Sequence, residues 1–429
     1  MPFDQTQSAT GETKRPGSRE MTFLLAGLMA LNAMAIDAMI PALPAIGDDL
    51  GVANENHRQW VVVFYMFGFG STQLIWGPLA DRFGRKPVLA IGVALYAGFA
   101  LLCGLATSFE LLVAARALQG ASAAVTRVLV VAMVRDLFES EAMARVMSLV
   151  FMVFMLVPVL APNIGQLILL FAPWQAIFVL LAAYGIAMLV WSWIRLPETL
   201  HPEFRRSLAW REMAGGAWQT IREPQSRGYT LALAVTFGAL TAYIASIQQI
   251  VDDAFRAPGA IGLVFAAVAA PMALGSWANS KYVGRFGLRR VGHGGAIGFA
   301  AVTVIHVLIA IAGFENLALF IVLQGLAMLF FAFTSSNLGA LAMEHMGPIA
   351  GTASSVQGVV GTIGGALIGL MIGQAFDGTV IPFLLGFAGC AVIALLLVVL
   401  TEPKRFLAPI QVDTEKRLPP EHSCPDDLG

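Results

Sequence analysis

A short charged turn separates two long apolar runs of the sequence: Gly77-Pro78-Leu79-Ala80-Asp81-Arg82-Phe83-Gly84-Arg85-Lys86-Pro87. Its glycines allow a tight change of direction, and its aspartate suits the positive end of a helix dipole. Its Arg and Lys residues are typical of a loop on the cytoplasmic side of a membrane. Because each flanking run is long enough to span a bilayer, the stretch predicts two membrane helices joined by a cytoplasmic turn.

The composition agrees with this interpretation. Of the 429 residues, 58% are hydrophobic and 12% are charged, and the mean hydropathy is +0.76. An ordinary soluble domain has about twice this share of charged residues. The sequence therefore predicts an integral membrane protein. The three cysteines, Cys103, Cys390 and Cys424, lie in two apolar runs and a polar tail, so they indicate no disulfide framework.

Apolar runs of spanning length recur along the whole chain. We predict twelve, at residues 21–46, 60–80, 88–106, 109–134, 146–170, 174–196, 229–252, 259–280, 290–313, 316–342, 351–375 and 380–401. A polar linker at 197–228 separates an N-terminal six-helix half, 21–196, from a C-terminal six-helix half, 229–401. Within the linker, an amphipathic segment at 208–221 is expected to lie on the membrane surface. Polar tails at 1–20 and 402–429 flank the two halves.

The positions of the basic residues predict the orientation. All but four of the 26 Lys and Arg residues lie in the tails, the linker or the loops after the second, fourth and eighth spans. Arg58 and Arg256 lie on the opposite side, while Arg116 and Arg127 lie within the fourth span. Because basic loops remain in the cytoplasm, we expect both termini to be cytoplasmic.

The charged turn has a second copy in the C-terminal half. Gly287 follows Gly84 by 203 positions, and the residues around it echo the turn: Gly284-Arg285-Phe286-Gly287-Leu288-Arg289-Arg290. The copy has Gly284 where the first turn has Asp81. Two halves related by an axis along the membrane normal produce such a repeat, and they place a substrate site between them near the midplane.

Three further stretches narrow the interpretation. They are Asp37-Ala38-Met39-Ile40-Pro41-Ala42-Leu43-Pro44 in the first span, Arg116-Ala117-Leu118-Gln119-Gly120 with Val134-Arg135-Asp136-Leu137 in the fourth, and Pro158-Val159-Leu160-Ala161-Pro162-Asn163-Ile164-Gly165 in the fifth. With the charged turn, they resemble the major facilitator superfamily, its twelve-helix drug:proton antiporters and, within these, the Bcr/CflA branch. The fifth-span element departs from the pattern, since Ala161 and Gln166 stand where glycine is usual.

The resemblance implies an all-α membrane protein that exports amphipathic drugs or small metabolites by alternating access. It implies a monomer in the bacterial inner membrane, whose partners are its small-molecule substrate, protons and the lipid bilayer, with no nucleic acid. The proton gradient would supply the energy in place of a cofactor. A proton-coupled importer of a small metabolite is an alternative on the same fold, and a non-transporting sensor or enzyme is another. The sequence has no phosphate-binding loop and no metal-ligand cluster, so we do not expect an enzyme.

The resemblance also implies a conformational switch at the charged turn. Asp81 would lie at the N-terminus of the eleventh helix, near Gly351, and Arg85 would reach Asp136. Such contacts would hold the halves together in one access state. The residues assigned to this switch are Gly77, Asp81, Arg82, Gly84, Arg85, Lys86 and Asp136.

Asp37 is the only acidic residue predicted to lie well inside a span. A carboxylate there costs several kcal/mol unless it is protonated, paired or hydrated, so it is a functional candidate. Counting along the helices, Asp37 lies about 13 Å and Arg116 about 10 Å from the periplasmic ends of their helices. The two groups could therefore couple protons together. A purely structural pairing of Asp37 with Arg116 is the alternative.

Arg116 and Arg127 are eleven residues apart, so they fall on nearly one face of the fourth helix, with Gly120 between them. This stripe is expected to face a central cavity, because lipid does not accept charge. Arg127 instead has the alternative of reaching the cytoplasmic boundary.

Other polar and apolar side chains are candidates for the walls of the cavity. The predicted cavity residues are Asn32, Met39, Gln119, Gly120, Arg127, Asn163, Gln166, Tyr243 and Gln248, and the fifth-helix element comprises Pro158, Pro162 and Gly165. Many of the amides have the alternative of bridging helices structurally. Four glycines recur at a spacing of four in the eleventh span and predict a close helix contact: Gly361, Gly365, Gly369 and Gly373.

Overall fold

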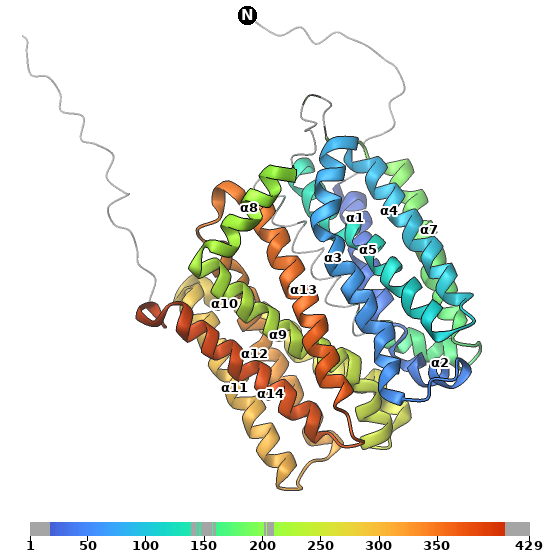
Figure 1. Ribbon diagram of the computed structural model, residues 1–429, viewed down its shortest axis with the longest axis vertical. Helices are drawn as coiled ribbons and strands as arrows, with labels where there is room; N and C mark the ends of the chain where they lie inside the picture. The colour runs from blue at the N-terminus through green and yellow to red at the C-terminus, as the bar shows by residue number, and fades with distance from the viewer. Residues whose placement is uncertain are drawn as a thin grey trace, which may run out of the picture.

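The computed structural model describes residues 18–138, 143, 146, 157, 160–200, 203 and 210–407. All regular secondary structure in these residues is helical. Figure 1 shows long helices in two groups, coloured blue to green and lime to red. Long apolar runs form helices here because a helix satisfies its own backbone hydrogen bonds where no water is available.

The N-terminal group contains the helices before the linker. They are α1 (Ser18–Asp37), η1 (Ile40–Ala42), α2 (Leu43–Asp49), η2 (Glu55–Gln59), α3 (Trp60–Phe83), α4 (Arg85–Gly104), α5 (Phe109–Leu137) and α7 (Gln175–Arg195). A shorter apolar helix, Leu160–Leu169, also belongs to it. Ser108 begins α5 as an N-cap, because its hydroxyl oxygen accepts a hydrogen bond from the Leu111 N–H at 3.2 Å.

The C-terminal group follows the linker helix α8 (Trp210–Arg222). It consists of α9 (Pro224–Gln249), η4 (Ile250–Ala254), η5 (Pro258–Ala260), α10 (Ile261–Phe286), α11 (Leu288–Ile311), α12 (Leu317–Met343), η6 (Gly347–Ile349), α13 (Ala350–Gln374), α14 (Ile381–Thr401) and η7 (Pro403–Arg405). Asn316 caps α12 as Ser108 caps α5, since its side-chain oxygen accepts from the Leu319 N–H at 3.0 Å.

Eleven of the described helices are long and apolar enough to cross a bilayer, and they match eleven of the predicted runs. The helix Leu160–Leu169 lies in the remaining run, 146–170, most of whose other residues fall outside the described part of the chain. The predicted ends differ by a few residues; for example, α10 ends at Phe286 and the predicted run ended at 280. Helices extend past the apolar core because their polar ends can be hydrated.

The two charged turns have the same backbone geometry. Gly84 separates α3 from α4 with φ +99°, and Gly287 separates α10 from α11 with φ +85°. A side chain at either position would be strained, because this region of backbone conformation is favourable only for glycine. The repeat seen in the sequence is thus a repeat of structure.

The two largest buried apolar clusters of the described residues occupy the two groups. One contains residues of the N-terminal group from Met21 to Leu196. The other contains residues from Ala239 to Ala391 together with Ile40, which the N-terminal group inserts into it. The linker helix α8 packs on α13 and α9, and Gly216 faces Thr352 near the start of α13. A helix therefore forms where the amphipathic segment was predicted.

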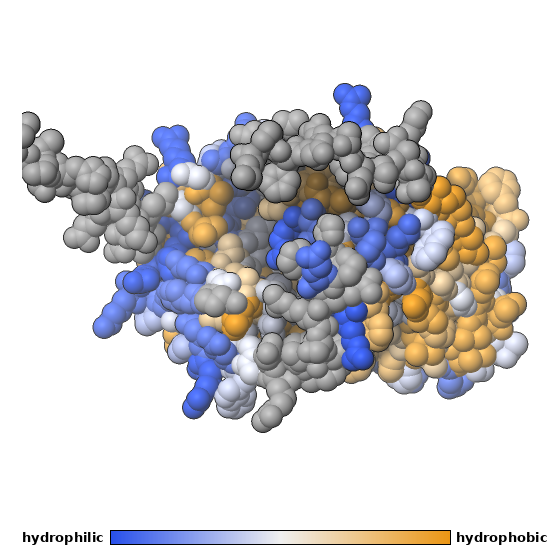
Figure 2. Space-filling model, turned by 90° about the horizontal axis from the view of Figure 1, so that it is seen from above, coloured by the Kyte–Doolittle hydropathy of each residue, from blue (hydrophilic) through white to orange (hydrophobic). Residues whose placement is uncertain are grey.

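The helices α3 and α13 form the main contact between the groups. In Figure 1 they approach each other toward the end that carries α2 and diverge toward the end that carries α8. We call the end that carries α2 the α2 end, and the end that carries α8 the basic end. Figure 2 looks onto the basic end, where hydrophilic side chains gather and hydrophobic ones flank them.

The glycines of α13 lie at close contacts, as predicted: Gly365 faces Phe237 of α9, and Gly369 faces Thr241.

Candidate transport site

Arg85 is the centre of the charged turn. Its buried guanidinium forms an ion pair with Asp136 at the end of α5, and its Nη2 lies 3.9 Å from the Asp81 carboxylate. Arg82 and Lys86 point elsewhere: the Arg82 guanidinium is 5.2 Å from the Phe83 ring, and the Lys86 ammonium is 5.2 Å from the Trp193 ring. The ion pair of Arg85 with Asp136 thus joins the start of α4 to the end of α5 within the N-terminal group.

Glu198 completes this cluster, and the sequence reasoning missed it. Its carboxylate accepts hydrogen bonds from the backbone N–H groups of Arg85 at 3.0 Å and Lys86 at 3.3 Å, which are the first residues of α4. A carboxylate at a helix N-terminus is stabilised by the helix dipole and by the unpaired N–H groups. The available signal was an acidic residue directly after the sixth predicted span.

The C-terminal group has a corresponding cluster at the same end. Arg289 of α11 binds Glu344, at 2.6 Å, and Glu402, at 2.8 Å. Burial opposes ionisation of Glu402, but hydrogen bonds from Arg289 and Tyr229 outweigh it and hold the pKa of Glu402 below its usual value. The pKa of Glu344 is also lowered, because its contact with Arg289 outweighs its partial burial. Sequence reasoning saw Arg289 as a loop residue and did not pair it.

Asp81 does not reach the start of α13 in this structure. Among the described residues its carboxylate contacts Arg85, and 48% of its side chain is exposed. A Cβ at Gly351 would meet no atom within 4 Å, so no described side chain lies against this position of α13. Gly77 is similarly open, with Val128 as the neighbour of its Cβ position at 3.8 Å. The predicted contact of Asp81 with α13 is therefore absent from this conformation, because α3 and α13 diverge at the basic end.

Arg116 is fully buried in α5 and is bound without a carboxylate among the described residues. Its guanidinium donates to the Val61 carbonyl at 2.9 Å, the Ala35 carbonyl at 3.0 Å and the Gln119 side-chain oxygen at 2.7 Å. It also lies 4.3 Å from the centre of the Tyr65 ring. These acceptors and the ring face replace the water that the charge loses on burial.

Asp37 ends α1, and 3% of its surface is exposed. Within the described residues, its carboxylate has neither an ion-pair nor a hydrogen-bond partner. The predicted pairing with Arg116 is therefore not formed; Arg116 binds the Ala35 carbonyl of the same helix instead. The Tyr65 and Tyr243 hydroxyls lie within electrostatic range of Asp37, one from each group of helices.

The predicted cationic stripe of α5 does not line one open cavity. A Cβ at Gly120 would overlap the backbone carbonyl of Tyr65, and a Cβ at Gly68 would overlap that of Ala117. These glycines let α3 and α5 pack closely, so the prediction of Gly120 as a cavity residue is wrong in this conformation. Arg127, farther along the same face, is exposed.

The other cavity candidates lie in different environments. Asn32 accepts a hydrogen bond from the Tyr65 hydroxyl at 3.0 Å, and Met39 is buried. Gln119 holds Arg116 and is therefore part of a helix contact. Gln248 donates to Asp252 at 2.9 Å. The buried Tyr243 hydroxyl has no hydrogen-bond partner among the described residues.

The fifth-helix element is described in part. Pro158 lies outside the described residues, whereas Pro162 is buried within the helix Leu160–Leu169. A Cβ at Gly165 would overlap the Ala38 carbonyl, so this glycine brings the helix against the end of α1. Asn163 and Gln166 both lie against Gly262 at the start of α10. The element therefore joins Asp37's helix to the C-terminal group.

A polar network closes the α2 end, and sequence reasoning missed it. The Asn56 side chain donates to the Gln374 carbonyl at 3.2 Å, and Gln374 donates back to the Asn56 carbonyl at 2.7 Å. Gln249 donates to the Asn56 side chain at 2.9 Å, and Gln59 pairs with Gln249. Uncharged polar residues near span ends carried no distinguishing signal in the sequence.

The fold and the charged turns define a multi-pass membrane transporter built from two similar groups of helices. The family model of the Major Facilitator Superfamily matches residues 25–369, and the chain belongs to this family. The protein is a transporter and not an enzyme.

Curated relatives and solved structures agree with this assignment. A bicyclomycin resistance protein homolog of Haemophilus influenzae is 29% identical over 382 residues, which cover 86% of this chain and 92% of that protein. A multidrug resistance protein, MdtL of Escherichia coli, is 38% identical over 174 residues, 40% of this chain and 44% of that one. The crystal structure of a D-xylose-proton symporter superposes with a TM-score of 0.68 at 14% identity, covering 89% of this chain and 96% of that one, and shows the same fold.

Proposed function

We propose that this protein exports amphipathic drugs or small metabolites across the bacterial inner membrane in exchange for protons. The observation that carries the proposal is the buried Asp37 carboxyl, which lacks a partner in the described residues and ends α1, three residues before Ile40, which packs in the core of the C-terminal group. The relatives named for bicyclomycin and multidrug resistance support export of drug-like molecules. The proton gradient would be the energy source, with no cofactor.

Asp37 is the proposed proton carrier. A buried ionised carboxylate without a partner costs several kcal/mol, so this conformation favours the protonated form. Its neighbour Ile40 is packed in the core of the C-terminal group, so movement between the groups would change the surroundings of Asp37. Protonation of Asp37 can be coupled to alternating access only if the surroundings of its carboxyl differ between the two access states.

Arg116 is proposed to tune this carrier indirectly. It is already bound to the Ala35 carbonyl and Gln119, so it would hold the turn of α1 before Asp37 in place. Substrate would meet polar groups left unpaired by the described residues, namely the Tyr243 hydroxyl and the amide of Gln324 in α12. Apolar walls and a few polar groups are typical of sites for amphipathic ligands.

The closed α2 end indicates one access state. If the basic end is cytoplasmic, as its Lys and Arg residues favour, this state opens toward the cytoplasm and is closed toward the periplasm. Substrate would enter as Asp37 releases its proton to the cytoplasm. After reorientation, substrate would leave and Asp37 would take a proton from the periplasm. The ion pair of Arg85 with Asp136 would persist, and Asp81 would contact α13 only in the other state.

Transport in inside-out vesicles tests the proposal. Vesicles with an acidic interior should concentrate a fluorescent drug or a labelled phenicol, and dissipating the gradient should release it. Asp37→Asn should abolish this uphill transport while substrate binding remains. Glu203→Gln, the same chemical change at an exposed linker residue, should transport normally. Accumulation only in right-side-out vesicles from an acidic bath would show import, and uphill transport by Asp37→Asn would exclude Asp37 as the carrier.

A further inference from the structure

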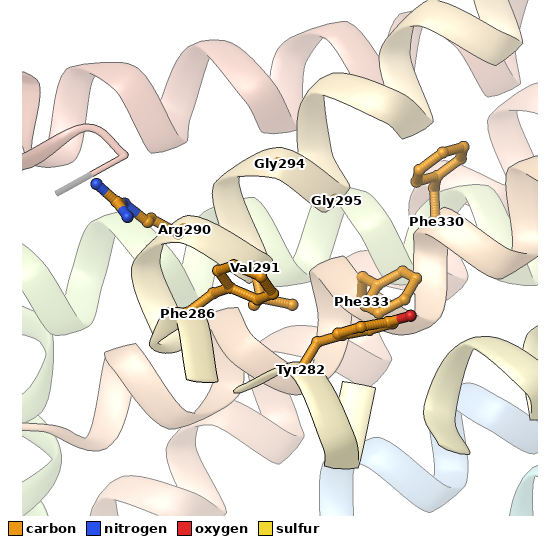
Figure 3. A pocket seen from close by; sticks show the side chains of 8 residues that line it. All are labelled: Tyr282, Phe286, Arg290, Val291, Gly294, Gly295, Phe330 and Phe333. Atoms are coloured by element: carbon orange, nitrogen blue, oxygen red, sulfur yellow. The ribbon is translucent and has the colours of Figure 1, made fainter. Parts of the chain in front are cut away.

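A groove of about 360 Å³ lies at the basic end of the C-terminal group, away from Asp37 and the contact between the groups. Helices α10, α11 and α12 form it, and they pack against one another. Figure 3 shows its aromatic side chains on three sides. We call it the aromatic groove, and its defining residues are Tyr282, Phe286, Val291, Gly294, Phe330 and Phe333.

Glycines of α11 give the groove its depth. A Cβ at Gly294 would meet no atom within 4 Å, so this position opens into the groove. A Cβ at Gly295 would lie 2.7 Å from the Cβ of Phe333, and one at Gly298 would lie 2.5 Å from the Phe330 ring. These two glycines let α12 and its aromatic side chains come close to α11. The result is an open apolar groove, with Tyr282 and Phe286 exposed on the surface of the spanning helices.

Basic side chains lie at the end of the groove toward the charged turn. In Figure 3 the Arg290 guanidinium extends from this end, away from the Phe330 and Phe333 rings. Its Nε donates to the Leu407 carbonyl at 3.2 Å, which fixes the group, and its terminal nitrogens have no hydrogen-bond partner within the described part of the chain. Within the described residues, neither Arg290 nor Arg285 forms an ion pair. The Arg285 guanidinium lies 5.4 Å from the ring of Phe286, a residue of the groove.

We propose that the aromatic groove binds one anionic phospholipid of the surrounding leaflet. An acyl chain would lie on the apolar floor between Tyr282 and Phe333, and the phosphate would be bound by Arg290 with Arg285 beside it. The argument is charge complementarity, since guanidinium groups that form no ion pair with any described residue, at the end of an apolar groove, match an anionic head on an apolar tail. A spanning helix exposes its outer face to lipid, so the occupant is present at high concentration.

The choice of a phospholipid follows from both parts of the site. A free phosphate ion would use the arginines and leave the aromatic floor uncovered. A neutral lipid would cover the floor and leave two cations without a counter-charge. Tyr282 and Phe286, with exposed fractions of 51% and 40%, are the amphipathic and aromatic residues expected where acyl chains meet head groups.

Native mass spectrometry of the purified full-length protein tests the proposal. Titration with phosphatidylglycerol should give a saturable single adduct, and phosphatidylcholine with the same acyl chains should bind at least fivefold more weakly. Arg290→Gln should weaken phosphatidylglycerol binding by about fivefold, as expected for one basic residue near an anionic lipid. Gly294→Trp should fill the groove and remove the adduct. Excess glycerol phosphate should not displace the lipid, because it lacks the acyl chain.

Two matched variants complete the experiment. Gly98→Trp places the same side chain at another open helical glycine, and Arg222→Gln removes another exposed arginine, in the linker helix. Both should bind lipid as the wild type does. Equal binding of the two lipids would overturn the recognition of charge, and displacement by glycerol phosphate would overturn the role of the acyl chain. Unchanged phosphatidylglycerol binding by Arg290→Gln, which should fold normally, would overturn the assignment of the lipid to the aromatic groove.

Discussion

Arg116 shows how a guanidinium can be buried in a membrane protein without a carboxylate partner in the described residues. Backbone carbonyls of α1 and α3, the Gln119 side chain and the Tyr65 ring surround it. Each acceptor lies in a direction that the planar guanidinium can use, whereas an ammonium is a point charge with different geometry. Arg116 therefore ties three helices together at the depth of Asp37.

Replacing Arg116 with lysine should be destabilising although the charge is kept. Lysine cannot reach all three acceptors and loses the stacking on Tyr65, so we expect a loss of about 2 to 4 kcal/mol in the free energy of unfolding. The measurement is the thermal unfolding of the detergent-purified protein. Arg127→Lys is the control, since Arg127 is exposed on the same helix. Equal melting temperatures of Arg116→Lys and wild type would contradict the conclusion that Arg116 holds the three helices together.

Glu402 should make stability depend on acid pH. Its pKa is lower in the folded protein than the ordinary value of 4.5, because Arg289 and Tyr229 favour its ionised form despite partial burial. Its contribution is thus present above about pH 4.5 and is lost as the pH falls through the folded pKa. Glu402→Gln should melt at a lower temperature than wild type at pH 7, and this difference should shrink toward pH 4. A pH-independent difference would contradict the ionic origin.

At the scale of elements, the two charged turns act as equivalent joints. In each turn, a glycine at positive φ separates the end of one helix from the start of the next. An arginine in each turn forms ion pairs with acidic residues. The first turn uses Arg85, with Glu198 capping α4, and the second uses Arg289 with Glu402. Equivalent backbone joints with different charged residues are expected of a repeat whose halves have diverged.

Alanine at these joints should destabilise the protein. Gly84→Ala and Gly287→Ala each place a Cβ in a conformation available only to glycine, with an expected cost of about 1 to 3 kcal/mol. Thermal unfolding measures the effect of each. Gly98→Ala, within α4 and open to space, should be neutral or slightly stabilising because alanine favours a helix. Wild-type stability in both joint variants would show that the turns accept ordinary backbone conformations.

At the scale of the whole molecule, the two groups contact along α3 and α13 and are latched at the α2 end. Asn56, Gln249 and Gln374 form a hydrogen-bonded network between the groups. Amide–amide contacts suit a surface that must open, because both sides can bond to water when they part. The charged clusters at the basic end instead lie within each group and hold that group together.

A reversible cross-link tests whether the latch must open during transport. In a background lacking the native cysteines, Asn56→Cys with Gln374→Cys should be joined by a short disulfide-forming reagent. Cross-linked protein should lose at least about tenfold in transport rate, because alternating access requires this end to part. Reduction should restore transport, and each single cysteine should be insensitive to the reagent. Full transport by the cross-linked protein would refute an opening at this position.

Local rules in the sequence determined much of this protein. Hydrophobic length determined the spanning runs, since helices are the element that satisfies the backbone inside a bilayer. Gly84 and Gly287 marked the turns, because glycine alone tolerates their backbone geometry. The glycines spaced along α13 predicted a close contact, which α9 makes. These features depend on chain neighbours and on the bilayer, so they can be inferred without knowing which helices meet.

The partners of side chains were decided by the tertiary structure alone. Helical periodicity placed Arg116 and Gly120 on one face, but it could not show that α3 covers that face and supplies carbonyl acceptors. Counting residues from the helix ends placed Asp37 at about the depth of Arg116. In the structure, the Arg116 guanidinium binds the Ala35 carbonyl instead, because the backbone of α1 lies close to α5. Glu198 and Asn56 gained their roles from contacts with residues over one hundred positions away. Such contacts depend on how helices pack, and helix packing depends on the shape of every side chain at the interface.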